Sequence, residues 1–278
     1  MRSKPLVRGG GQTHADLSRI RNQRSFPMSF DRDAAVYALL EARFTRRGLD
    51  YLPKSSQPRT ETEAIDIQDG VACALGPIAA WKVGSATANS EPFRAPIHAD
   101  TLFVEASHIP AKMFRVIGVE AEIVYRFGRD LDPDKGPYAR NDVLDAVVSM
   151  HPAIEIVDTR FKTFGALDPL SHRADQGNHG ALIVGPALSD WRILDPVRQP
   201  VTLVINGERV CDTIGGNSAV DPVRLLVWLA NIGSRSLGGL HAGQFVTTGS
   251  CTGTIFVESA AQVTIDFQGL GAMTLAID

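Results

Sequence analysis

From residue 79 onward the chain consists of short apolar segments separated by glycine-rich turns, and this pattern restricts the fold more than any other feature. Apolar and polar residues alternate in several segments, as in strands with one buried face. Asn206-Gly207 joins two of them, and Asn-Gly is the preferred two-residue hairpin turn because both positions tolerate positive φ. The predicted strands are 79–83, 117–127, 153–157, 181–184, 201–205, 208–212, 245–248, 254–257, 262–267 and 272–277.

Helices are predicted chiefly before these strands. Apolar residues recur at helical spacing over 36–44, and the sequence Thr60–Glu63 has the form of a capping box that begins a second helix. Further predictions are helices over 141–150 and 219–233 and a proline-containing loop over 85–114. Helices first and strands afterwards indicate an α+β, mainly β fold, not a doubly wound parallel sheet.

The charge is unevenly distributed along the 278 residues. Residues 1–28 have a net charge of +5, so the rest carries −8 of the overall −3. We predict a flexible basic arm over 1–28 and a single domain over 29–278, divided into a helical part (29–78) and a β-rich part (79–278). The arm is alternatively an organelle-targeting peptide, or the product of a start codon upstream of Met28. The acidic body disfavours nucleic acids and anionic membranes as partners.

The composition also restricts the compartment. No segment has the apolar length of a secretory signal or a membrane span. The three cysteines are far apart in sequence and form neither a disulfide framework nor a zinc-binding pattern. A cytoplasmic protein is therefore expected, because a reducing compartment suits free thiols.

Glu120-Ala121-Glu122 stands out because it lies inside an apolar run that is predicted to be a strand. Alternate side chains of a strand share a face, so the two carboxylates should project together. Like charges in partly buried surroundings repel each other and lose hydration, and a bound cation relieves both effects. The alternative is an exposed strand face with solvated acids.

Glu155 strengthens the case for a metal because it lies among the apolar residues of a second strand. A buried glutamate is rare unless it is paired or coordinates an ion. Three carboxylates suit a hard divalent ion, Mg²⁺ or Mn²⁺, and leave coordination positions open for water and substrate.

Two further segments could bind an acid. Lys82 ends a short apolar strand, where it is a cationic anchor, a proton donor or a surface lysine. The segment 244–253 is a strand that enters a turn rich in hydroxyl groups and glycine. Such turns can hold a carboxylate or a phosphate, although most are only turns.

These segments together resemble the fumarylacetoacetate hydrolase superfamily, and most of all its 2-keto-4-pentenoate hydratase branch, which includes 2-oxohexenedioate decarboxylases. The resemblance covers residue 30 to the end. Its motifs are Trp81–Gly84, Glu120–Glu122, Pro152–Arg160, Ala174–Asn178, Leu226–Asn231, Gly239–Gly243 and Gly269–Gly271. It implies a β-sandwich-like roll with a helical N-terminal part, and homo-oligomers.

The resemblance also implies roles for individual residues. Glu120, Glu122 and Glu155 match the metal ligands, and Lys82 and Glu155 are expected to be catalytic. The substrate-binding positions are Lys82, Asp158, Arg160, Asp175, Asn178, His179, Thr248 and Ser250.

The function implied is that of a Mg²⁺- or Mn²⁺-dependent lyase that hydrates a 2-hydroxy-2,4-dienoate or 2-oxo-4-enoate acid in catabolism. A 2-oxo-3-hexenedioate-type decarboxylase is an alternative, because the same metal–enolate chemistry serves both reactions. A C–C hydrolase of diketo acids would need a base that activates water, for which His172 and His179 are the candidates. A non-catalytic 2-oxo-acid binding protein is the alternative from another class. The loop Glu91–Pro96 and His179 depart from the branch's usual pattern and leave the substrate open.

Overall fold

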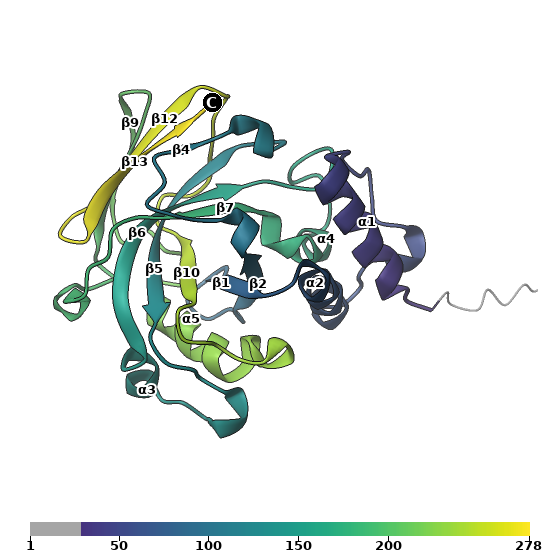
Figure 1. Cartoon of the computed structure of the whole chain (residues 1–278), viewed down its shortest axis with the longest axis horizontal. Helices are drawn as coiled ribbons and strands as arrows, with labels where there is room; N and C mark the ends of the chain where they lie inside the picture. Colours follow the sequence, from purple (N-terminus) through teal and green to yellow (C-terminus); the bar gives the residue numbers. More distant parts are fainter. Residues whose placement is uncertain (1–28) are drawn as a thin grey trace, which may run out of the picture.

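The computed structural model describes residues 29–278 (Figure 1), so the predicted basic arm lies outside the described residues. The first two helices begin at the predicted places. Asp31 caps the first, since its Oδ1 accepts a hydrogen bond from the Ala34 N–H at 3.1 Å, and the Thr60 hydroxyl accepts the Glu63 N–H at 3.1 Å in the second. The helices are α1 (Arg32–Thr45), α2 (Glu61–Leu75), α3 (Arg140–Leu144), α4 (Pro169–Ala174) and α5 (Pro222–Trp228), which continues into a π-helical turn, Leu229–Gly233.

The larger sheet is strongly curved and runs in the order β2-β1-β10-β5-β6-β7-β3, with β11 paired to one end of β5 (Figure 1). Its central pair, β5 and β6, is antiparallel and sets Glu120 directly opposite Glu155. The strands are β1 (Ile78–Gly84), β2 (Phe93–His98), β3 (Leu102–Val104), β5 (Gly118–Phe127), β6 (Val147–Val157), β7 (His179–Val184), β10 (Phe245–Ser250) and β11 (Ile255–Phe256).

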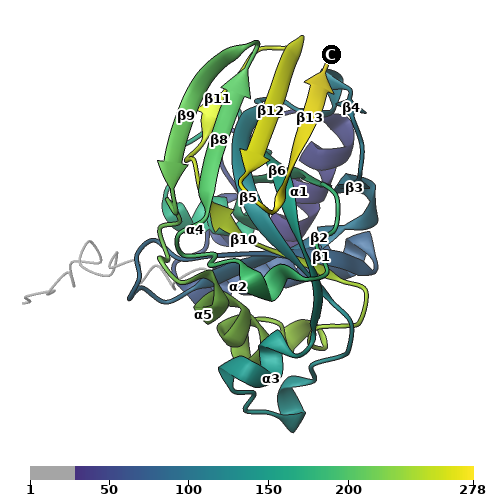
Figure 2. The ribbon, with the colours of Figure 1, turned by 90° about the vertical axis from the view of Figure 1, so that its left-hand side faces the viewer.

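A smaller sheet covers one face of the larger sheet (Figure 2). Asn206 and Gly207 have φ values of 52° and 83°, which confirms the predicted hairpin turn. The strands of this sheet, in spatial order, are β4 (His108–Ile109), β13 (Gly271–Ile277), β12 (Ala261–Phe267), β8 (Pro200–Ile205) and β9 (Glu208–Ile214).

Strand β5 alternates between two environments and thereby places the candidate site. Val119, Ala121 and Ile123 are buried in the main apolar core with residues of the smaller sheet. Glu120 and Glu122 point to the opposite face, away from the smaller sheet, as the period of two requires. The acidic pair therefore lies on the face of the larger sheet on which β12 and β13 do not pack.

Two sequence predictions were wrong. The stretch 85–114 is not a plain loop, because it contains β2, β3 and β4. The helix predicted over 141–150 ends at Leu144, and the chain enters β6 at Val147. In both cases pairing with strands distant in sequence prevails over the local pattern.

The expected fold class is confirmed: the described residues form an α+β structure, made mostly of strands, with helices α1 and α2 at the N-terminal end. Within residues 29–278, no helix is both long and apolar enough to cross a membrane. Short 3-10 turns connect several of the elements, at Lys54–Ser56, Ala99–Thr101, Ala111–Met113, Pro133–Lys135, Gln176–Asn178, Trp191–Ile193 and Arg235–Leu237.

Candidate metal centre and acid-binding pocket

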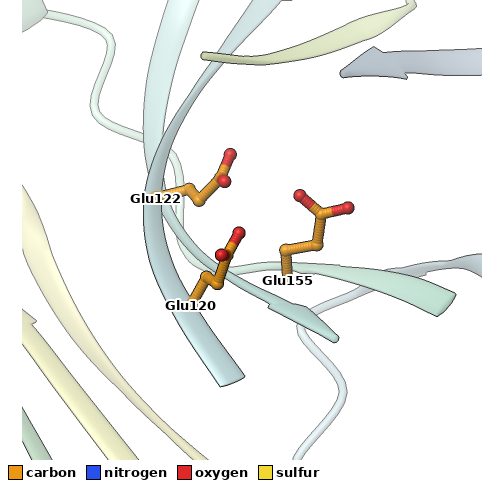
Figure 3. A group of neighbouring side chains, drawn as sticks. All are labelled: Glu120, Glu122 and Glu155. Carbon is orange, nitrogen blue, oxygen red and sulfur yellow. The ribbon is translucent and has the colours of Figure 1, made fainter. Parts of the chain in front are cut away.

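Three glutamates meet on the open face of the larger sheet (Figure 3). Glu120 and Glu122 extend from β5 and Glu155 from β6, and one oxygen from each lies within 4.8 Å of the others. Glu155 is fully buried and Glu122 is 1% exposed. The structure thus brings together the three acids that the sequence singled out.

Hydroxyl and backbone groups hold the two acids of β5. The Thr247 hydroxyl donates to Glu122 Oε2, which also accepts the Gly249 N–H at 3.1 Å. The Thr254 hydroxyl donates to Glu120 Oε1. These donors fix the orientation of the carboxylates but supply no positive charge.

Glu155 is held by two nitrogen donors. Its Oε1 lies 2.6 Å from Lys82 Nζ and 3.1 Å from His179 Nδ1. His179 Nε2 lies 3.1 Å from the Thr101 hydroxyl. A neutral imidazole with its proton on Nδ1 satisfies both contacts, and burial lowers the pKa of His179 to about 4, which keeps the ring neutral.

The other oxygen of Glu155, Oε2, is buried without a hydrogen-bond partner among the described residues. A buried oxygen of an ionised carboxylate is costly to leave unpaired. This orphaned oxygen is therefore evidence that Glu155 binds a ligand, such as a metal ion, from outside the described residues.

The electrostatics of the site are unbalanced. Burial raises the pKa of Glu122 well above its ordinary value, and the Glu155 and Glu120 carboxylates raise it further. Burial, followed by repulsion from Glu155, likewise raises the pKa of Glu120. Burial also opposes ionisation of Glu155, but Lys82 and His179 outweigh it and lower its pKa. One ammonium thus faces three carboxylates.

These observations fit a hard divalent cation. The donor set consists of carboxylate oxygens, the orphaned oxygen of Glu155 belongs to the triad, and Lys82 offsets only one of the three negative charges. Lys82 is charged and anchored, because the three glutamates outweigh the effect of burial and raise its pKa.

A cavity of about 340 Å³ opens over the triad. Lys82, Asn178 and Ser250, which were expected to bind substrate, line it beside Glu120 and Glu122. Its apolar wall is made by Phe93, Val157 and Phe164.

The remaining expected substrate residues are buried elsewhere. Arg160 and Asp175 form a buried ion pair, and Asp158 accepts the backbone N–H groups of Arg115 and Val116 at 3.1 Å. His179 is buried behind Glu155, and the Thr248 hydroxyl donates to the carbonyl oxygen of Ile123 at 3.2 Å. None of these five lines the cavity over the triad.

Sequence reasoning missed Thr247 and Thr254, which orient the acids of β5, and Thr101, which contacts His179. The sequence shows a hydroxyl-rich turn at 244–253, but not that Thr247 within it and Thr254 just after it face the glutamates. Thr101 gave no signal, because it belongs to a stretch predicted to be a loop.

Comparison with known proteins defines the class. Residues 81–277 match the model of the fumarylacetoacetate (FAA) hydrolase C-terminal family, and the chain belongs to this family. The curated relatives of this chain are hydratases and decarboxylases, as in the branch that the sequence resembles.

Among them, a 2-keto-4-pentenoate hydratase of Paraburkholderia xenovorans (strain LB400) is 29% identical over 183 residues, which cover 66% of this chain and 67% of the relative. A 4-oxalocrotonate decarboxylase of Pseudomonas putida is 30% identical over 135 residues, 48% of this chain and 50% of the relative.

Solved structures confirm the fold. The 4-oxalocrotonate decarboxylase from Pseudomonas putida G7, complexed with magnesium and adipate, has a TM-score of 0.78 at 22% identity and covers 90% of this chain and 99% of its own. Fumarylpyruvate hydrolase from Pseudomonas aeruginosa, in complex with Mn²⁺ and pyruvate, has a TM-score of 0.52 at 17% identity and covers 71% and 88%. The sequence resemblance thus named the right family and fold.

Proposed function

We propose that the protein is a Mg²⁺- or Mn²⁺-dependent lyase that hydrates a 2-hydroxy-2,4-dienoate or 2-oxo-4-enoate acid. The observation that carries the proposal is the convergence of three glutamates, one with an orphaned buried oxygen, at a cavity that Lys82, Glu120 and Glu122 line. The hydratase relative, and related structures that hold magnesium or Mn²⁺ with small organic acids, support it.

Glu120, Glu122 and Glu155 would hold the ion. When bound, Mg²⁺ or Mn²⁺ acts as a Lewis acid for the negative charge that develops on a 2-oxo acid. The threonine hydroxyl groups and the Gly249 N–H keep the carboxylates of β5 aimed at one point, so the ligands need little rearrangement.

Lys82 would bind the carboxylate of the acid. Its Nζ donates to Glu155 Oε1 at 2.6 Å and to the Gly177 carbonyl oxygen at 3.1 Å, which leaves one N–H for substrate. The raised pKa favours this role as a fixed cation over that of a neutral base. The short contact with Glu155 also gives a route for a proton between the two groups.

The wall of the cavity favours a monocarboxylate. Lys82 is the only cationic side chain among the described residues that line it, whereas Phe93, Val157 and Phe164 make an apolar side. The second carboxylate of a hexenedioate would lose hydration there without an ionic partner, which is costly. This supports hydration of a dienoate with a short or apolar tail.

Decarboxylation of a 2-oxo-hexenedioate is the second candidate, and it rests on the decarboxylase relative at 30% identity. A C–C hydrolase is less well supported, because neither His172 nor His179 lines the cavity where water would be activated.

The test is a substrate panel with metal-free protein and with added Mg²⁺ or Mn²⁺, in which products are identified by mass. The panel contains a 2-hydroxy-2,4-dienoate, a 2-oxo-hexenedioate, an acylpyruvate and oxalate. The proposal predicts metal-dependent addition of one water to the dienoate. Loss of CO₂ from the hexenedioate alone would favour the decarboxylase, and cleavage of the acylpyruvate the hydrolase. Saturable oxalate binding without turnover would indicate a binding protein.

A further inference from the structure

A second cavity, of about 140 Å³, lies between the end of α1, the turn Ala99–Thr101 and the segment before β5. Four arginines line it, Arg43, Arg46, Arg115 and Arg160, and it shares no lining residue with the acidic pocket. This cavity is therefore lined mainly by positive charge, whereas the pocket at the glutamates is lined mainly by negative charge.

Two of the arginines are already engaged with side chains. Arg160 pairs with Asp175 and donates to the His179 carbonyl oxygen at 2.7 Å. Arg43 donates to Gln176 Oε1 at 3.0 Å and lies 3.3 Å from Asp100. These contacts fix the inner wall of the cavity.

Arg46 and Arg115 differ, since neither lies within ion-pair distance of a carboxylate in residues 29–278. Arg46 donates to the Lys112 carbonyl oxygen and Arg115 to the Arg46 carbonyl oxygen at 3.0 Å. These backbone contacts hold both side chains at the cavity without neutralising them.

The charge of the lining remains positive after the acids are counted. Asp100 and Asp158 line the cavity and Asp175 pairs with Arg160, so the four guanidinium groups retain a net charge of +1. Asp158 is itself occupied by the backbone N–H groups of Arg115 and Val116. Burial, and repulsion from Arg160, lower the pKa of Arg43.

We propose that this cavity binds a small oxyanion, a phosphate or a carboxylate, through Arg46 and Arg115. Guanidinium groups present planar pairs of donors that match both kinds of oxyanion. The volume of the cavity fits one such group. Pockets for larger metabolites begin at about 300 Å³, well above this volume. The net positive charge favours an anion over a neutral ligand.

Isothermal titration calorimetry with the metal-free full chain tests this proposal, with inorganic phosphate in one arm and succinate in the other. Metal is omitted so that succinate cannot bind at the glutamates. We expect saturable binding with one site per chain for at least one anion. Arg46→Gln/Arg115→Gln should weaken it by about tenfold or more, because charge-assisted hydrogen bonds are lost.

The matched control is Arg192→Gln/Arg209→Gln, which removes the same charge from two exposed arginines paired with other acids. It should keep the wild-type affinity. Arg46 and Arg115 are exposed, and a melting curve without anion verifies that their variant folds.

Tighter binding of phosphate would identify a phosphoryl group as the ligand, and tighter binding of succinate a carboxylate. Absence of saturable heat with both anions up to about 10 mM, or equal affinity in the Arg46→Gln/Arg115→Gln variant, would overturn the proposal. So would a loss of oligomers in that variant without anion binding by wild type, because an acid from a second copy would then fill the cavity. None of these outcomes depends on the lyase activity.

Discussion

Replacement of Glu122 by glutamine gives the sharpest test of the metal centre. Glutamine keeps the shape of the side chain and can still accept hydrogen bonds from Thr247 and Gly249. It removes one anionic ligand and also one of the three like charges. The variant should therefore lose metal-induced stabilisation, while its metal-free fold becomes more stable than metal-free wild type at neutral pH.

The expected size of the effect follows from binding linkage. Metal at about 100 times its dissociation constant stabilises the folded state by ~2.7 kcal/mol. For a domain of this size, 1 kcal/mol moves the melting temperature by ~2–4 °C, so wild type should gain ~5–11 °C. If the variant binds metal about a hundredfold more weakly, the same concentration gives only ~0.4 kcal/mol, or ~1–2 °C.

The assay is thermal unfolding followed by circular dichroism in chelated buffer, with and without Mg²⁺ or Mn²⁺. Glu208→Gln is the control, because it removes an exposed glutamate from the hairpin of the smaller sheet. The control should keep the wild-type shift. A full metal-induced shift in Glu122→Gln would refute the assignment of this carboxylate as a ligand.

Three other predictions follow from the same site. Because burial raises the pKa of Glu120 and Glu122, these two groups make metal-free stability fall with rising pH, whereas His179, whose pKa burial lowers, has the opposite effect below about pH 6.5. Urea unfolding should therefore show metal-free stability falling from about pH 7 towards 8, and metal should flatten this slope; stability that rises over this range would contradict the assignment. Lys82→Met should lower kcat/KM by at least about a hundredfold. The control Lys162→Met removes an exposed lysine that pairs with an acid and should leave steady-state rates unchanged; similar rates in both variants would show that Lys82 has only a structural role. Phe164→Arg should raise the ratio of hexenedioate to dienoate turnover by about tenfold, because it supplies a cation for the second carboxylate. An unchanged ratio would show that the apolar wall does not determine substrate specificity.

The local sequence pattern was sufficient to predict much of the fold. The hairpin at Asn206-Gly207 and the strand over 117–127 were predictable, because turn chemistry and alternation act over a few residues. The start of α2 was equally accessible, since Thr60 caps it as the sequence indicates. These elements needed no information about distant contacts.

The missed strands depend on their neighbours. β2 contains Pro96, which argued for a loop, but β2 is the outermost strand of its sheet and pairs only with β1, so a missing N–H is tolerated there. The first half of β6 read as helix, yet residues 147–152 form a strand along β5. Neither partner is visible in a local window.

The site divides in the same way. Carboxylates in apolar strands are unusual enough to mark Glu120, Glu122 and Glu155 as candidate metal ligands from sequence alone. Their supporting hydroxyl groups are ordinary threonines, and their role arises only because β10 pairs with β5. Successive residues of β10 face opposite ways, so the expected Thr248 binds a backbone carbonyl while Thr247 reaches Glu122.

The charge balance links stability to the proposed chemistry. Three carboxylates, one ammonium and a neutral His179 leave a charge of −2 when the acids are ionised, which equals the charge that a dication neutralises. In the metal-free fold burial and this excess of charge together raise the pKa of Glu120 and Glu122, which costs stability at neutral pH. The repulsion is relieved when an ion binds, so it adds to metal affinity. A loss of the pH slope and a gain in melting temperature should therefore appear at the same metal concentration, since both report occupancy of one site.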